Sequence, residues 1–75
     1  MKGPATVGVI TPGSYSFNTG TEETMSVLSG VLFARLPGKK GFVPYKAGRR
    51  FKVAAQSSFD VRADADVAYL CTYKR

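Results

Sequence analysis

The sequence predicts an all-β protein, a small barrel or sandwich built from short strands. Three observations indicate this fold class. Glycine and proline recur at short intervals, the segments between them are rich in valine, tyrosine, phenylalanine and threonine, and apolar side chains in several segments occupy every second position. No window of about eleven residues repeats its apolar residues at the helical period. The 75 residues suffice for one domain, residues 1–75, with one small core.

The first half of the chain contains four candidate strands. Residues 6–11 are mostly β-branched and end at a Pro-Gly turn signal. Further on, Tyr15 and Phe17 alternate with small polar side chains, so both aromatic rings are expected on the inner face. Residues 25–36 form a long apolar stretch that Gly30 interrupts, and we expect two strands with a bend at that glycine.

The second half of the chain alternates in the same way. Apolar side chains occupy every second position on two neighbouring segments, namely Phe51, Val53, Phe59 and Val61. A further set shares one face of the last candidate strand: Val67, Tyr69, Cys71 and Tyr73. This period is typical of half-buried strands, so these side chains are expected to point inward. Arg35 and Arg62 fall on the opposite positions and are expected to point to solvent.

The composition excludes several kinds of site. Cys71 is the only cysteine and cannot form an internal disulfide; we expect it to be a small buried hydrophobic residue. The chain has no histidine, which excludes a triad with a histidine base and disfavours a zinc or copper site. No apolar run approaches the roughly 20 residues of a membrane-spanning helix, and the N-terminus lacks the pattern of a signal peptide. We therefore expect a cytoplasmic protein without a metal.

The net charge of +6 is concentrated in the middle of the chain. Residues 35–52 include seven lysines and arginines and no acidic residue. Such a patch can attract nucleic acid or phosphorylated small molecules. Because no nucleic-acid-binding motif accompanies it, the simpler interpretation is a solvated face that keeps the protein soluble.

One acidic residue has the spacing of a known motif. Glu23 precedes Gly30 by the interval found in the second half of the first cupin motif, where a His-x-His pair and the glutamate bind a metal inside a small barrel. Phe17 and Thr19 occupy the histidine positions here, and Phe59 occupies the histidine position of the second motif. The chain therefore resembles a small single-domain cupin, a jelly-roll β-barrel of the RmlC-like type, that has kept its glutamate and lost its histidines.

A closer resemblance covers residues 5–73. It rests on four stretches that follow the order of the family pattern and need no alignment gap between them, TVGVITPGSYSFNT, EETMSVLSGVL, LPGKKGFVPYKAGRRFKVA and SSFDVRADADVAYLCTY. Together they resemble the pyrimidine/purine nucleoside phosphorylases, which are small cupins. The chain departs from that pattern at Glu22, Phe42 and Ala54, where the family usually has proline, tryptophan and proline. We also expect the family's first strand to be missing, and its loss to expose a sheet edge or weaken a dimer.

The resemblance implies phosphate-dependent cleavage of purine and pyrimidine nucleosides to free base and ribose 1-phosphate. Inorganic phosphate would be the co-substrate, and no other cofactor is expected. A homodimer is expected because cupins of this size commonly pair. Two alternatives stay open: a cupin that binds a small molecule without catalysis, and a basic barrel that binds nucleic acid. Binding that weakens steeply with salt would distinguish the last of these.

Candidate site residues follow from the motif and from the aromatic positions. Glu23 is the candidate catalytic residue, holding the ribose hydroxyls or stabilising the developing cation. The candidate substrate-binding residues are Tyr15, Phe17, Thr19, Ser57 and Phe59. Each has a structural alternative: Glu23 as an exposed turn residue, the aromatic residues as core, and the two hydroxyls as partners of turn backbone groups. No basic residue is assigned to phosphate.

Overall fold

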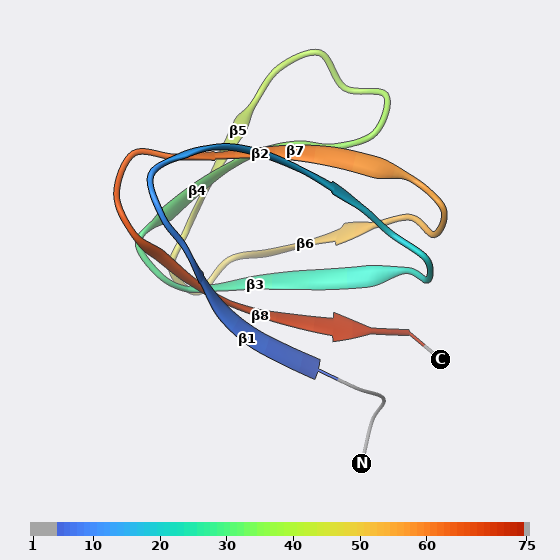
Figure 1. Ribbon diagram of the computed structural model, residues 1–75, viewed down its shortest axis with the longest axis horizontal. Helices are drawn as coiled ribbons and strands as arrows, with labels where there is room; N and C mark the ends of the chain where they lie inside the picture. The colour runs from blue at the N-terminus through green and yellow to red at the C-terminus, as the bar shows by residue number, and fades with distance from the viewer. Residues whose placement is uncertain (1–4, 75) are drawn as a thin grey trace.

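The computed structural model describes residues 5–74, which form eight strands in two four-stranded sheets (Figure 1). The strands are β1 (Ala5–Ile10), β2 (Gly13–Asn18), β3 (Glu23–Ser29), β4 (Val31–Arg35), β5 (Val43–Lys46), β6 (Arg50–Val53), β7 (Ser58–Ala63) and β8 (Val67–Tyr73). One sheet has the order β1-β8-β3-β6 and the other β2-β7-β4-β5, with antiparallel pairing throughout. The predicted all-β fold class is confirmed.

The core lies between the two sheets, which form the lower and upper layers in Figure 1. Strand β7 shows the pattern most clearly, because every second side chain is buried. The fully buried side chains include Leu32, Val27, Val53, Val61 and Val67. Burying a side chain of this size stabilises the fold by roughly 1.5–3 kcal/mol. The inward positions predicted from alternation in the second half of the chain are confirmed for Phe51, Val53, Phe59, Val61, Val67 and Cys71.

The bend predicted at Gly30 separates β3 from β4. Gly30 has a φ of 83°, a conformation that glycine adopts at little cost. A Cβ at this position would also lie 2.7 Å from the backbone oxygen of Asp66, which is too close for any side chain. Glycine is therefore required here for two reasons, and the turn passes the chain from one sheet to the other.

The two ends of the barrel differ. The short turns β1–β2, β3–β4, β5–β6 and β7–β8 close the end on the left of Figure 1. The longer β2–β3, β4–β5 and β6–β7 loops gather at the other end, where β8 also ends. We call this second end the open end, because a cavity opens there, between the first residue of β3 and the last residue of β8.

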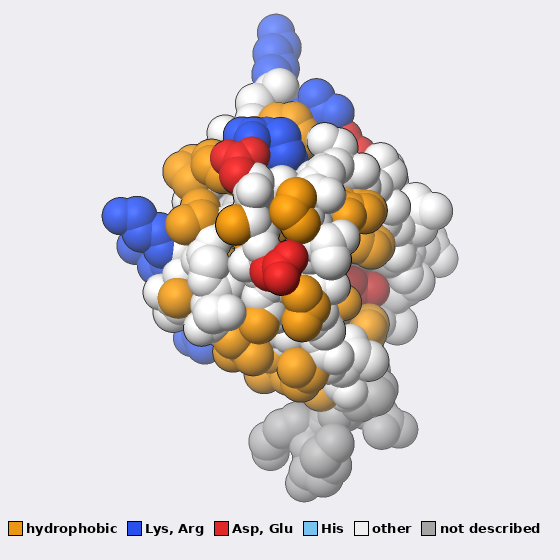
Figure 2. Space-filling model, turned by 60° about the vertical axis from the view of Figure 1, so that its left-hand side comes forward, with side chains coloured by type: hydrophobic (Ala, Val, Ile, Leu, Met, Phe, Trp, Pro, Cys, Tyr) orange, Lys and Arg blue, Asp and Glu red, His pale blue; other side chains and the backbone are white. Residues whose placement is uncertain are grey.

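The outer faces of the two sheets carry different side chains. Val7, Val9 and Leu28 are exposed on the β1-β8-β3-β6 sheet, and Figure 2 shows hydrophobic side chains gathered on the lower part of one face. On the other sheet, Arg35 and Arg62 lie on the outer face, as alternation predicts, where each pairs with an aspartate. The described part of the chain contains no helix long and apolar enough to cross a membrane.

Candidate functional site

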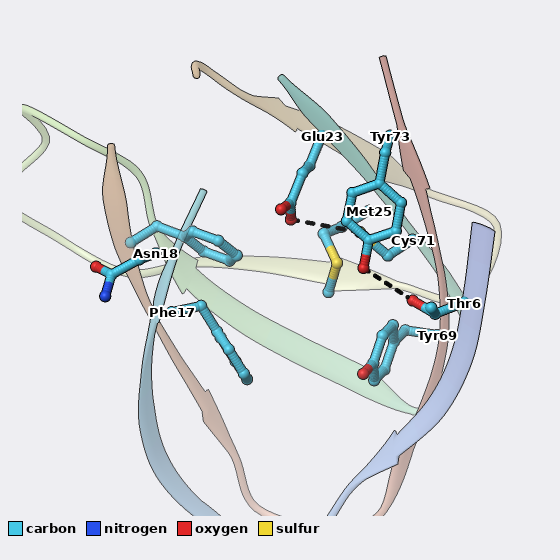
Figure 3. A pocket seen from close by; sticks show the side chains of 9 residues that line it. Thr6, Phe17, Asn18, Glu23, Met25, Tyr69, Cys71 and Tyr73 are labelled. Atoms are coloured by element: carbon cyan, nitrogen blue, oxygen red, sulfur yellow. Dashed lines mark hydrogen bonds between the residues drawn. The ribbon is translucent and has the colours of Figure 1, made fainter. Parts of the chain in front are cut away.

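A cavity of about 180 Å³ lies between the sheets at the open end of the barrel (Figure 3). Five strands contribute to it. Its lining residues are Thr6, Phe17, Asn18, Glu23, Met25, Phe59, Tyr69, Cys71 and Tyr73.

Strand register brings the polar members of this set together. Glu23 at the start of β3 is the partner of Tyr73 at the end of β8, and Cys71 is the partner of both Thr6 on β1 and Met25 on β3. Side chains of directly opposed residues share one face of a sheet, so these five point into the barrel together. The acid, the thiol and two hydroxyl groups therefore meet on one wall.

The opposite wall is aromatic. Phe17 on β2 and Phe59 on β7 are register partners, and their ring centroids lie 5.6 Å apart in a tilted arrangement. Phe59 is almost fully buried, whereas Phe17 has 37% of its surface exposed. Phe17 thus presents a ring surface that a ligand can contact, while Phe59 supports it from the core.

Two hydrogen bonds organise the polar wall, and both are drawn in Figure 3. The Cys71 thiol donates to Glu23 Oε1 at 3.4 Å, and the Tyr73 and Thr6 hydroxyl oxygens lie 3.1 Å apart. Burial raises the pKa of Cys71 to about 11, and the Glu23 carboxylate acts in the same direction. The hydrogen bond between Thr6 and Tyr73 lowers the pKa of Tyr73, but desolvation and the neighbouring Cys71 and Glu23 outweigh it and raise that pKa. Both groups are therefore protonated donors at neutral pH.

The Glu23 carboxylate is the reactive feature of this arrangement. Within residues 5–74, its only hydrogen-bond donor is the Cys71 thiol, and a thiol is a weak donor. No lysine or arginine among these residues lines the cavity. A carboxylate in this setting can accept hydrogen bonds from ligand hydroxyl groups and can stabilise positive charge that develops nearby.

The structure brings three of the six candidate site residues into this cavity: Glu23, Phe17 and Phe59. Tyr15 lies farther along β2, beside a second cavity that Phe17 also lines. Its hydroxyl lies 2.8 Å from Thr11 Oγ1 and donates to the Thr11 carbonyl at 2.9 Å. Tyr15 is therefore tied to the β1–β2 turn.

Thr19 and Ser57 lie outside the cavity, in the loops that follow β2 and β6. The Thr19 hydroxyl donates to the Ala54 carbonyl at 2.6 Å and accepts from the Ser57 amide at 2.9 Å. The Ser57 hydroxyl donates to the Ala55 carbonyl at 3.1 Å. Both hydroxyls satisfy loop backbone groups, as the structural alternative for these residues expects, and the candidate site leaves them out.

Sequence reasoning assigned no site role to six lining residues: Thr6, Asn18, Met25, Tyr69, Cys71 and Tyr73. Alternation on the last strand did place Tyr69, Cys71 and Tyr73 on one inner face. It could not indicate which end of that face meets an open cavity, because this depends on strand pairing between distant segments. Among residues 5–74, no three histidine, cysteine or acidic side chains lie close enough to hold a metal ion.

Comparison with known proteins agrees with this architecture. A protein of unknown function from Vibrio parahaemolyticus superposes with a TM-score of 0.90 at 38% identity, over 92% of this chain and 73% of that one. A cupin-2 domain protein from Shewanella frigidimarina superposes with a TM-score of 0.77 over 95% of this chain and 69% of its own, and at 12% identity it shows the fold alone. The class of protein is therefore a small cupin-like barrel.

Sequence comparison defines the family. Residues 1–73 match the family described as pyrimidine/purine nucleoside phosphorylase. A relative from Marinobacter nauticus with that name is 53% identical over 70 residues, which are 93% of this chain and 75% of the relative. A Pseudomonas putida relative with the same name is 48% identical over 97% of this chain and 78% of its own. The chain belongs to the pyrimidine/purine nucleoside phosphorylase family.

Proposed function

We propose that this protein is a broad-specificity nucleoside phosphorylase, a pentosyltransferase that cleaves purine and pyrimidine nucleosides with inorganic phosphate. The observation that carries the proposal is the Glu23 carboxylate, which points into the cavity with one weak donor, in a chain whose relatives bear this name. The products are the free base and ribose 1-phosphate. No cofactor other than the phosphate co-substrate is part of the proposal.

The reaction exchanges one bond at C1′ of the ribose. The C1′–N bond breaks and its electron pair leaves with the base nitrogen, which takes up a proton. A phosphate oxygen forms the new bond to C1′, and dihydrogen phosphate can supply the proton. As in glycoside cleavage, the sugar carries positive charge in the transition state.

Glu23 acts on that charge. Its carboxylate accepts hydrogen bonds from the ribose hydroxyl groups in the ground state and stabilises the sugar cation as the base departs. Phosphate and carboxylate repel each other, so the proposal places them on opposite faces of the sugar. The hydroxyls of Tyr73 and Thr6 lie on the same wall and offer further partners for the sugar.

The test is an assay for released base. The purified protein is incubated with uridine and, separately, with inosine, each with and without inorganic phosphate, and the products are separated by chromatography. Release of uracil and of hypoxanthine only when phosphate is present is the expected result. Phosphate-independent release would identify a hydrolase instead, and no release from a folded sample would contradict the proposal.

One observation favours a second candidate, a cupin that binds nucleosides without cleaving them. No lysine or arginine among residues 5–74 lines the cavity, so these residues offer phosphate no cationic anchor there. Calorimetric titration with inosine distinguishes the two candidates. Binding of inosine together with an absence of turnover would favour this second function.

A further inference from the structure

A second cavity adjoins the one that holds Glu23. Its volume is about 230 Å³, and it lies along the open seam between β1 and β2, which are edge strands of the two sheets. Its lining residues are Val9, Ile10, Thr11, Tyr15, Phe17 and Tyr69. The candidate site accounts for only part of this lining.

The two cavities are parts of one trough. Phe17 and Tyr69 line both of them. Along β1 the lining passes from Thr6 in the first cavity to Val9 and Ile10 in the second. On β2 and β8 as well, the second cavity is lined by residues nearer the β1–β2 turn than the first cavity is. Figure 3 shows Phe17 and Tyr69 at the end of the first cavity away from Glu23, where the second begins.

Gly8 makes room for Tyr69, which lines both cavities. It is the register partner of Tyr69, and a Cβ at Gly8 would lie 2.7 Å from the Tyr69 hydroxyl oxygen. The tyrosine ring therefore lies directly over the backbone of β1. Any larger residue at this position would push the ring from its place between the two cavities.

The two cavities differ in chemistry. The first holds a carboxylate, a thiol and several hydroxyl groups, which suit a sugar. The second is lined by aliphatic and aromatic side chains and by no charged residue of the described chain. Its hydroxyls belong to Thr11, Tyr15 and Tyr69. Those of Thr11 and Tyr15 are already engaged with each other and with turn carbonyls, and that of Tyr69 lies over the β1 backbone at Gly8. The second cavity therefore suits a flat, uncharged ring that binds mainly by stacking.

We propose that the second cavity is the nucleobase subsite. The ribose lies beside Glu23, and the base passes between Phe17 and Tyr69 into the trough along β1 and β2. This inference rests on the proposed function and names where its substrate lies. Neither cavity reaches the roughly 300 Å³ at which small-molecule pockets begin, but the two together exceed it. Stacking on aromatic faces accepts any base, so one trough serves purines and pyrimidines.

The first experiment maps each half of the substrate on the full chain. Backbone amide NMR shifts are recorded during titration with hypoxanthine, with uracil and with ribose 1-phosphate. Both bases are expected to shift the amides of Val9, Thr11 and Tyr15, and the sugar phosphate those of Thr6 and Glu23. Base-induced shifts confined to the Glu23 end, or to the outer sheet faces, would overturn the assignment.

Variants test the same assignment by affinity. Tyr69→Leu keeps apolar bulk and removes the aromatic face, so hypoxanthine affinity is expected to fall about tenfold or more. Tyr45→Leu is the control, because Tyr45 packs on Phe51 and lines neither cavity. Equal affinities for the two variants would contradict the proposal.

A second matched pair uses two glycines. Gly8→Ala would place a Cβ 2.7 Å from the Tyr69 hydroxyl oxygen, so it is expected to displace that ring and weaken base binding several-fold. Gly20→Ala is the control, because a Cβ at Gly20 meets nothing within 4 Å, and it is expected to leave base binding unchanged. The same affinity in both variants would overturn the proposal.

Failure of this inference can be told apart from failure of the proposed function. Base binding in the trough without phosphate-dependent cleavage would support the subsite and contradict the proposed enzymatic activity. Phosphate-dependent cleavage with bases bound elsewhere would support the activity and contradict the subsite.

Discussion

Asp60 and Glu23 are carboxylates on neighbouring layers of the same small barrel, and their surroundings differ. Asp60 lies on the outer face of β7, where Ser16 donates to Oδ1 at 2.6 Å and the Arg35 guanidinium pairs with Oδ2. Glu23 lies on the inner face of β3 and receives one long hydrogen bond from a thiol. Both acids are partly buried, but the one on the outer face has the stronger hydrogen-bond partners.

The difference indicates what each acid does. Cross-strand partners on β2 and β4 engage both oxygens of Asp60, so this carboxylate fastens three strands of one sheet together. Glu23 has lone pairs left for a ligand and faces a cavity rather than bulk solvent. A carboxylate that faces a cavity without a strong donor is free to bind a ligand, which points to a role in binding or catalysis.

The largest expected effect separates these two acids directly. Glu23→Gln keeps the size and one acceptor but removes the negative charge, so turnover of inosine is expected to fall about 10³-fold, with the fold intact by circular dichroism. Asp60→Asn is the matched control and is expected to change turnover less than about twofold. Parent-like turnover in a folded Glu23→Gln variant would remove the role given to Glu23.

The next effect concerns the thiol beside Glu23. Because burial raises the pKa of Cys71 from 9.0 to about 11, the thiolate fraction at neutral pH is about 100-fold below that of an ordinary cysteine. Native protein is therefore expected to react with iodoacetamide at least about 100-fold more slowly than unfolded protein. Below pH 9.0 the thiol is protonated in both the folded and the unfolded protein. As the pH rises from 9.0 toward about 11, the unfolded protein loses this proton more readily, so the free energy of unfolding is expected to fall. Equal alkylation rates would show that the inner wall is open to solvent.

Thr19 resembles Asp60, because its side chain already has hydrogen-bond partners within the protein. Thr19 is 6% exposed and bridges the Ala54 carbonyl and the Ser57 amide. Thr19→Val is expected to leave these groups unsatisfied and to lower the free energy of unfolding by about 1–3 kcal/mol. Urea denaturation measures this loss. The Michaelis constant for inosine should stay within about twofold of the parent, and a large increase would return Thr19 to the substrate site.

The smallest expected effect is on the way stability depends on pH in acid. Hydrogen bonds from Ser16 and Arg35 lower the pKa of Asp60 below its ordinary value of 3.8. A depressed carboxyl pKa contributes stability above the unfolded value, and this contribution is lost as the pH falls through the folded value. The melting temperature of Asp60→Asn is therefore expected to depend less on pH than that of the parent as the pH falls below 3.8. Identical pH profiles for parent and variant would show that the Arg35 pair contributes nothing measurable, as is common for surface pairs.

The sequence by itself determined seven of the eight strands and most of their inner faces, but it did not predict β5. Alternation is a local property, so it identified Phe51, Val53, Phe59 and Val61 as inward residues, and Gly30 as a bend, before any pairing was known. Family motifs along the chain also indicated the cupin-like fold and singled out Glu23. These inferences need only the order of side chains along one strand or the spacing of one motif.

Only the tertiary structure decided which inward residues form a site. Alternation treats Thr19, Phe17 and Tyr69 alike, but pairing of strands far apart in sequence places Phe17 and Tyr69 against a cavity and leaves Thr19 bonded within a loop. The contacts between Cys71 and Glu23 and between Tyr73 and Thr6 join residues 48 and 67 positions apart. Register between β1, β8 and β3 creates these contacts, and no local pattern along the chain encodes which end of a barrel stays open.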